Sequence, residues 1–377
     1  MRYFSKLSVL LGSVLLASCT GGGNANEIVF GEYGSMTGSE SSFGVSTHRG
    51  VMMAIDEANA AGGFNGKKFR VVSYDDQGKS EEAVTAITKL ITRDRVALVL
   101  GEVASSRSIA AGAVAQQYKV PMVSPASTNP KVTQLGEYVF RVCFIDPFQG
   151  KVMAKFALEH LKKKKAAVLR DIRSDYSVGL ADYFSKEFRA MGGQIALDVA
   201  YSTGDVDFKA QLTSIRTAKP EVIFLPGYYT EVGLIARQAK ELGLNVPLLG
   251  GDGWDSDKLT EIGGDAIVGH YFSNHYSAED QRPSVQNFIA KYRAVHKETP
   301  DSMVVLAYDA TLVAIDAVKR AKDLSPASIR DALAATKGVP GITGEVTLNE
   351  NRDAVKPAVV MRVAGPKRYS YVTTIQP

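Results

Sequence analysis

The stretch from Val96 to Thr128, VALVLGEVASSRSIAAGAVAQQYKVPMVSPAST, contains the repeating unit of this chain. Its apolar start, Val96–Leu100, has the length of a buried strand, and a stretch with helical spacing runs from Ser105 to Tyr118. A second short apolar run, Pro121–Val123, follows at once. A strand, a helix and a strand in this order predict a βαβ unit with parallel strands.

The same alternation extends outward from this stretch and starts again after Asp146-Pro147. Two arrays of similar length predict two similar lobes, so we expect an α/β fold built from two Rossmann-like lobes. The predicted strands cover residues 28–30, 69–72, 96–100, 121–123, 166–169, 195–197, 222–225 and 247–249, and the predicted helices cover 46–61, 80–93, 105–118, 148–161, 177–191, 207–219 and 230–243.

Two helix boundaries carry local signals. The first helix should stop at Gly62-Gly63, because a residue without a Cβ tolerates the left-handed conformation that ends many helices. Ser80 is of the type that caps helix N-termini, so the second helix should begin directly after it.

The C-terminal part breaks the alternation. Helical patterns near 284–297, 304–321 and 325–336 have no strands between them, and strand-like runs follow at 345–348 and 359–363. We expect these helices to return to the first lobe, which makes both lobes discontinuous and joins them by a multi-strand hinge. The predicted division is 27–145 plus 275–348 for lobe 1 and 146–274 plus 349–377 for lobe 2.

The N-terminus is typical of an export signal. Arg2 and Lys6 precede the apolar run Leu7–Leu16, and small residues lead to Cys19. A run of about ten apolar residues is too short to span a bilayer, which needs roughly 20. We therefore interpret residues 1–18 as a cleaved signal, Cys19 as a lipidation site and 19–26 as a flexible tether, with a plain signal peptide and a coincidental cysteine as the alternative.

Composition agrees with an exported, lipid-anchored protein outside the cytoplasm. Removing residues 1–18 takes away two basic residues and no acid, so the net charge falls from +4 to +2, and no nucleic-acid partner is expected. Only Cys143 remains beside Cys19. About 350 residues with 45% hydrophobic composition supply two cores without a disulfide, and we expect a monomer.

The loops after the predicted strands are the candidate site, because ligands of open α/β sheets bind outside the carboxyl ends of the strands. In the first lobe these loops are rich in hydroxyls and small residues, whereas in the second they are aromatic and acidic. Such walls suit a zwitterion, whose carboxylate would face the first lobe and whose ammonium would face the second. The loops are 34–38 with 43–44, 102–106 and 124–128 in the first lobe, and 175–176, 227–231 and 250–254 in the second.

The whole mature chain resembles the branched-chain amino acid binding family of periplasmic binding proteins, fold type I. The resemblance rests on Gly34-Ser-Met-Thr-Gly38, Asp56-Glu-Ala-Asn-Ala-Ala-Gly-Gly63, Tyr74-Asp-Asp76 and Pro125-Ala-Ser-Thr128, and later on Asp175-Tyr-Ser-Val-Gly179, Pro226-Gly-Tyr-Tyr-Thr-Glu231 and Gly250-Gly-Asp-Gly253. It implies an ABC importer component that captures a small aliphatic or uncharged amino acid and delivers it to a permease and its ATPase.

The resemblance also implies roles for individual residues. Ser105 matches the serine that binds the ligand carboxylate, and Ala126 and Thr128 match positions that bind the α-amino and α-carboxyl groups. Tyr176 and Tyr228 match the aromatics of the second lobe. The remaining correspondences are Phe43, Val103 and Ala104 in the side-chain pocket, Asp252 where relatives carry a glutamate that faces the ammonium, and Gly78 and Ala104 where some relatives have a disulfide. Because aspartate is one methylene shorter than glutamate, Asp252 puts the identity of the ligand in doubt.

Other functions fit less well. The glycine-rich loop after the first strand lacks the Gly-Lys-Ser/Thr of a P-loop and the dinucleotide fingerprint, no Gly-x-Ser-x-Gly elbow is present, and the histidines lack zinc spacing. We therefore expect no enzymatic activity, cofactor or metal. An extracytoplasmic sensor, or a binder of amides or short carboxylates, remains open as an alternative.

Overall fold

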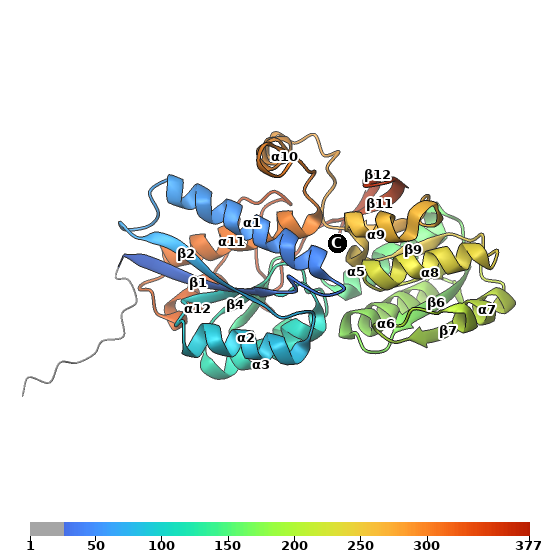
Figure 1. Cartoon of the computed structure of the whole chain (residues 1–377), viewed down its shortest axis with the longest axis horizontal. Coiled ribbons are helices and arrows are strands. Elements are labelled where there is room, and N and C mark those ends of the chain that lie inside the picture. The colour runs from blue at the N-terminus through green and yellow to red at the C-terminus, as the bar shows by residue number, and fades with distance from the viewer. Residues whose placement is uncertain (1–25) are drawn as a thin grey trace, which may run out of the picture.

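The apolar runs of the first half form a five-stranded parallel sheet in the order β2-β1-β3-β4-β5. A computed structural model describes residues 26–377 and is shown in Figure 1. The strands of this sheet, with the helices around it, are called lobe 1. They are β1 (Glu27–Gly34), β2 (Lys68–Asp75), β3 (Leu98–Leu100), β4 (Met122–Ser124) and β5 (Val139–Arg141), with α1 (Ser41–Ala60), α2 (Ser80–Thr92), α3 (Ser105–Tyr118) and α4 (Lys131–Gln134).

The second half forms a seven-stranded sheet in the order β12-β11-β10-β9-β8-β6-β7, called lobe 2 with its helices. β6 to β10 run parallel, whereas β11 is antiparallel to both β10 and β12. Its strands are β6 (Lys165–Asp171), β7 (Gln194–Tyr201), β8 (Val222–Phe224), β9 (Leu248–Gly250), β10 (Tyr271–Asn274), β11 (Ala358–Gly365) and β12 (Arg368–Ile375). Its helices are α5 (Asp146–Lys155), extended by a π-helical turn at Phe156–His160, α6 (Asp175–Ala190), α7 (Lys209–Ala218), α8 (Tyr229–Glu241) and α9 (Asp257–Gly263), with short 3₁₀ turns at Asp252–Trp254 and Gly264–Ala266.

The three late helices, α10 (Pro283–His296), α11 (Ser302–Arg320) and α12 (Pro326–Ala334), lie between β10 and β11 in the sequence. α11 lies against α1, and its apolar side chains share one core with Phe30 and Val51 of lobe 1. Gly50 allows this close approach, because a Cβ at that position would lie 2.2 Å from the carbonyl oxygen of Val304.

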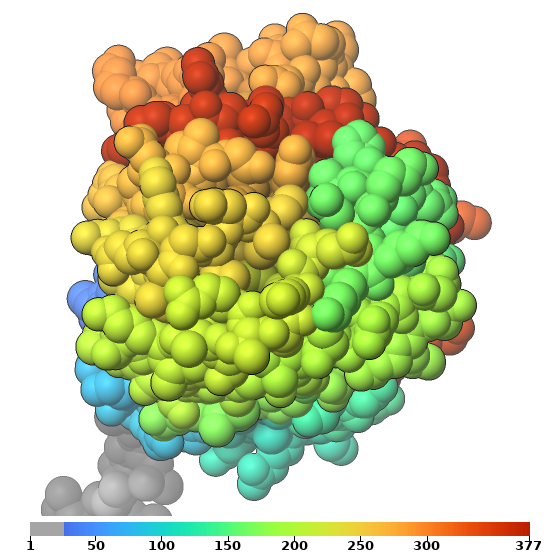
Figure 2. Space-filling model, turned by 90° about the vertical axis from the view of Figure 1, so that its right-hand side faces the viewer, coloured from blue at the N-terminus to red at the C-terminus, as the bar shows by residue number. Residues whose placement is uncertain are grey.

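The chain therefore passes between the lobes three times: after β5, after β10 and before β11. Figure 2, which views lobe 2 end-on, shows β11 and β12 in red between α10 in orange and the yellow and green segments of lobe 2. The two-lobed α/β fold and the connection by several strands are as predicted, whereas the residue boundaries of the lobes stay a prediction.

Several local predictions differ from the structure. Residues 345–348 are not a strand; Val346 and Leu348 make only isolated bridges to Val339 and Ala354. Ser80 is the first residue of α2 and not its cap, which is Lys79. Gly62 and Gly63 follow α1 with φ of 102° and 74°, as predicted. The sequence patterns missed β5, β12 and α9.

The predicted signal peptide, Cys19 and the tether up to residue 25 lie outside the described residues. Within residues 26–377, the structure has no helix that is long and apolar enough to cross a membrane.

Candidate functional site

The carboxyl ends of the parallel strands in both sheets carry the loops that meet between the lobes. On the lobe 1 side, β3 leads into the N-terminus of α3 at Ser105. The backbone N–H groups of a first helical turn have no acceptor within the helix, so this turn can bind an anion. The Ser105 side chain is buried, and its hydroxyl accepts a hydrogen bond from the backbone N–H of Asn129 at 3.2 Å. The loops after β3 and β4 are thus joined beside Ser105.

Arg141 fixes the loop that carries Ala126 and Thr128. Its guanidinium is fully buried and donates to the carbonyl oxygens of Ser127 at 2.7 Å and Asn129 at 2.8 Å. Both residues flank Thr128, whose own hydroxyl is buried without a hydrogen-bond partner among the described residues. The structure therefore holds the Thr128 hydroxyl ready for a group that the protein does not supply.

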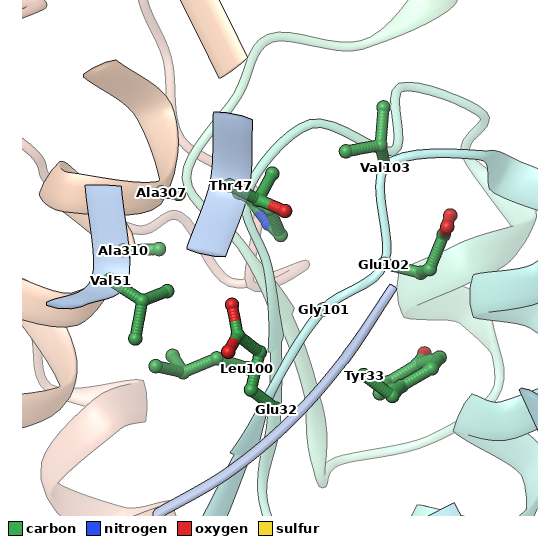
Figure 3. Close-up of a pocket in the computed structure, with 11 residues that line it drawn as sticks. Glu32, Tyr33, Thr47, Val51, Leu100, Gly101, Glu102, Val103, Ala307 and Ala310 are labelled. Carbon is green, nitrogen blue, oxygen red and sulfur yellow. The ribbon is translucent and has the colours of Figure 1, made fainter. Parts of the chain in front are cut away.

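A small cavity lies behind the β3 loop, inside lobe 1, with room for about one water molecule. Figure 3 shows Glu32, Thr47 and Val51 on one side of β1, and Tyr33 and Glu102 on the other. Glu102 accepts a hydrogen bond from the Ser35 hydroxyl at 3.0 Å. The cavity lies among the side chains that support the loop after β3, and it is too small for an amino acid.

Aromatic rings from both lobes meet at the other wall. Tyr228 stacks on Tyr176 with ring centroids 5.2 Å apart, and Phe43 of lobe 1 meets Tyr228 edge-on at 5.7 Å and Tyr229 at 4.9 Å. Phe43, Ala126 and Tyr229 also belong to one apolar cluster that spans the two lobes. The structure is therefore a closed form, in which side chains of the two lobes are in direct contact.

Asp252 lies beneath these rings and is buried. One carboxylate oxygen accepts hydrogen bonds from the Gln149 side-chain amide at 2.9 Å and from the Tyr176 hydroxyl at 3.0 Å. The other lies 3.0 Å from Nε2 of His275, whose ring stacks on Phe144. Three protein groups thus fix Asp252, and since a carboxylate has about four acceptor positions, one is left for a ligand.

Asp146, the first residue of α5, is a site residue that the sequence patterns did not identify. Its backbone N–H donates to the Thr128 carbonyl at 2.9 Å, and the side chain is fully buried. Neither carboxyl oxygen makes a hydrogen bond of normal geometry among the described residues, although the Thr128 hydroxyl lies close enough to favour the ionised form. Burial raises the pKa of Asp146 well above its usual value and the charge of Asp252 adds to this, whereas the Thr128 hydroxyl and Arg141 oppose it. A buried carboxyl without a hydrogen bond of normal geometry suits a cationic group of a ligand.

One sequence feature could have pointed to Asp146, because Asp146-Pro147 is typical of the beginning of a helix after a strand. Gln149 and His275 offered none, because their roles depend on which segments meet at Asp252.

The structure brings most of the predicted residues together. Seven of them are buried and Tyr228 is partly buried. Ala104 is the N-cap residue of α3, directly before Ser105. The eight predicted site residues are Phe43, Ala104, Ser105, Ala126, Thr128, Tyr176, Tyr228 and Asp252.

The arrangement offers groups that can bind a small polar molecule. The described residues contain no group of three or more histidine, cysteine or carboxylate side chains that could hold a metal ion. One end of the site offers a helix N-terminus and hydroxyls, and the other offers two carboxyl groups and stacked rings.

Comparisons with known proteins agree with this geometry. A family model described as periplasmic binding protein matches residues 27–367. The chain is 32% identical to a leucine-, isoleucine-, valine-, threonine- and alanine-binding protein of Pseudomonas aeruginosa, over 85% of each chain. It is 33% identical to a Leu/Ile/Val-binding protein of Rhizobium johnstonii, over 87% of this chain and 89% of that one.

Solved structures give the same result. The crystal structure of a leucine-binding protein, LivK, from Thermotoga maritima superimposes with a TM-score of 0.89 at 37% identity, covering 93% of this chain and 99% of that one. The branched-chain amino acid transporter substrate-binding protein LivJ from Streptococcus pneumoniae, in complex with isoleucine, gives a TM-score of 0.88 at 32% identity, covering 93% and 100%.

Proposed function

Because this chain belongs to the periplasmic binding protein family, in its branched-chain amino acid group, we propose that it captures a small aliphatic or uncharged amino acid between its lobes. We further propose that it delivers this ligand to the permease and ATPase of an ABC importer. Membership of the family agrees with the resemblance drawn from the sequence motifs.

The observation that carries the proposal is the pairing of opposite chemistry at the two ends of one buried site. The N-terminus of α3 and Ser105 would bind the α-carboxylate, because free N–H groups at a helix N-terminus favour anions. Thr128, Asp146 and Asp252 would bind the ammonium, which needs a charged partner once it is removed from water.

The side chain of the ligand would lie among apolar residues of the cluster that spans the lobes. Phe43, Val103, Met303 and Leu306 are all buried there. Such a surface favours an aliphatic side chain, because an unpaired polar or charged group would lose hydration without gaining a hydrogen bond. The names of the two relatives, which include leucine, isoleucine and valine, agree with this.

Location and anchoring complete the proposal. Residues 1–18 would direct export, Cys19 would be acylated, and the chain would act outside the cytoplasm while held to the membrane by its lipid. Ligand exchange would require the lobes to separate by bending the three connecting segments.

The test is a thermal-shift panel of amino acids, simple amides, short carboxylates and sugars, followed by calorimetry on the best hit. We expect an aliphatic amino acid to give the largest shift and to bind with one site per chain. A best hit without an amine would contradict the amino-acid proposal and favour a binder of amides or carboxylates. Normal uptake in cells that lack this protein, together with a lost transcriptional response to the ligand, would favour a sensor.

A further inference from the structure

Neighbouring residues on three loops of the site face different partners. Ser105, Thr128 and Tyr176 belong to the proposed ligand site. Their chain neighbours Ser106, Asn129 and Asp175 lie at the boundary between the lobes. Ser106 and Asn129 of lobe 1 both contact Asp175, the first residue of α6 in lobe 2.

Asp175 concentrates four hydrogen bonds across the boundary, which we call the Asp175 contact. Its carboxylate accepts from the Ser106 hydroxyl at 3.0 Å and from the Lys131 ammonium at 3.1 Å. Its backbone N–H donates to the Ser106 hydroxyl at 2.9 Å, and its carbonyl accepts from the Asn129 side-chain amide at 2.7 Å.

Other hydrogen bonds across the boundary include two made by Ser42 and one made by Thr230. The Ser42 backbone N–H donates to the Tyr229 hydroxyl at 3.1 Å, the hydroxyls of Ser42 and Ser256 lie 2.8 Å apart, and the Thr230 hydroxyl donates to the Ser39 carbonyl at 2.7 Å. Ser42 and Thr230 make fewer such bonds than Asp175, whose carboxylate makes two of its four.

Gly179, one turn further along α6, leaves the space that the Asn129 side chain of this contact occupies. A Cβ at Gly179 would lie 2.7 Å from the side-chain nitrogen of Asn129, so a larger residue would push away the amide that binds the Asp175 carbonyl. The Asp175 side chain is not needed to start α6, because Ser174 caps the helix by accepting from the Ser177 backbone N–H.

We propose that Asp175 is a positioning residue that holds the lobes closed without touching the ligand, and so sets how long the ligand stays bound. The proposal rests on the function proposed above. Closure would be stabilised equally for every ligand, because each of the four bonds joins protein to protein.

In Asp175→Ala the lost Ser106 bond to the carboxylate carries the effect rather than the ion pair, and the two bonds made by the Asp175 backbone remain. The side chains of Lys131 and Asp175 are 66% and 37% exposed, and exposed ion pairs contribute little. The hydroxyl of Ser106 bonds to a carboxylate in a part-buried position, and such charge-assisted bonds are stronger than neutral ones.

The experiment measures association and dissociation rates for leucine, valine and alanine with the wild type and with Asp175→Ala. We expect dissociation to be faster by roughly 5- to 20-fold for all three ligands, with the association rate changed little. Lys131→Ala, which removes only the exposed ion pair, should change dissociation by no more than about twofold.

Two further variants separate closure from folding. Gly179→Ala should also speed dissociation, although alanine favours a helix by roughly 1 kcal/mol over glycine, so a fall in helix stability cannot explain the result. Combining Ser106→Ala with Asp175→Ala should give less than the product of the single effects, because the two residues share bonds.

Small-angle scattering of ligand-free protein gives a readout that does not depend on the ligand, and Asp175→Ala should have the larger radius of gyration. Equal dissociation rates in wild type and Asp175→Ala would overturn the proposal, as would losses that differ more than about threefold between ligands, which would mean direct contact. If the wild type binds none of the amino acids, the proposed function fails, and the scattering comparison alone decides the role of Asp175.

Discussion

Replacing Asp146 with asparagine separates ligand binding from stability at the site. The side chain is fully buried, and its carboxyl oxygens make no hydrogen bond of normal geometry among the described residues. The variant keeps the shape but cannot ionise when an ammonium binds. A ligand ammonium would lose its ionic partner, while the ligand-free protein would lose only the interaction of the carboxyl group with the Thr128 hydroxyl.

The size of the effect follows from these contacts. Removing one partner of a buried ion pair costs roughly 3–5 kcal/mol. The asparagine oxygen can still accept from the ammonium, and a hydrogen bond to a charged group recovers at least about 1.5 kcal/mol. The net loss is about 1.5–3.5 kcal/mol, which weakens binding by about 10- to 300-fold.

Calorimetry on the best amino-acid hit measures this loss, and thermal unfolding without ligand is the control. We expect the melting temperature of the ligand-free variant to change by less than about 3 °C. Binding within about threefold of the wild type would refute the role of Asp146 as ammonium partner. Weaker binding together with a large fall in melting temperature would instead indicate a structural role.

Four other predictions test neighbouring parts of the argument. Asp252→Asn should lower amino-acid affinity by about 100-fold or more. It should also lower ligand-free stability by about 1–3 kcal/mol, because three donors lose their carboxylate. Calorimetry measures the first effect and thermal unfolding the second. The raised pKa of Asp146 should fall when an ammonium binds, so binding should release a proton and tighten as pH rises towards the ligand-free pKa. Calorimetry in two buffers of different ionisation enthalpy should detect the proton. Asp146→Asn should abolish this proton release. Cys19→Ser should lose palmitate labelling and leave the membrane fraction, whereas equal labelling would contradict acylation. A fragment of residues 26–300 should leave lobe 1 sensitive to protease, because α11 is missing; a resistant lobe 1 would show that α11 is dispensable.

The sequence predicts the fold well where strands are buried on both faces. Val96–Leu100 and Val222–Leu225 are continuous apolar runs between helical patterns, and both contain interior strands of a sheet, β3 and β8. β12 was missed, because Arg368–Ile375 lies at a sheet edge and mixes polar with aromatic residues. Residues 345–348 have strand-like composition but no neighbouring strand to pair with, and tertiary context overrides composition there.

The site shows a similar limit. Loops at strand ends can be located from the order of elements alone, and this order points to the loops that contain Ser105, Thr128 and Tyr176. The roles of these three residues were implied by the family resemblance. The partners of Asp252 could not be located in this way. Gln149 follows β5 and His275 follows β10, and only the packing of α5 against β10 brings both to one carboxylate. The sequence near Gln149 or His275 does not show that the two residues lie close together.

The packing of α11 on α1 has a consequence for the timing of synthesis. α1 begins at residue 41 and its partner at residue 302, so about 260 residues separate them. At ribosomal rates of about 5–20 residues per second, α1 waits roughly 13–50 s for the helix against which Gly50 is shaped. Lobe 1 is thus incomplete for most of translation, although it contains the first strand made. If residues 1–18 direct export, as we propose, such a delay is favourable, because an unfolded chain fits a narrower translocation channel than a finished lobe.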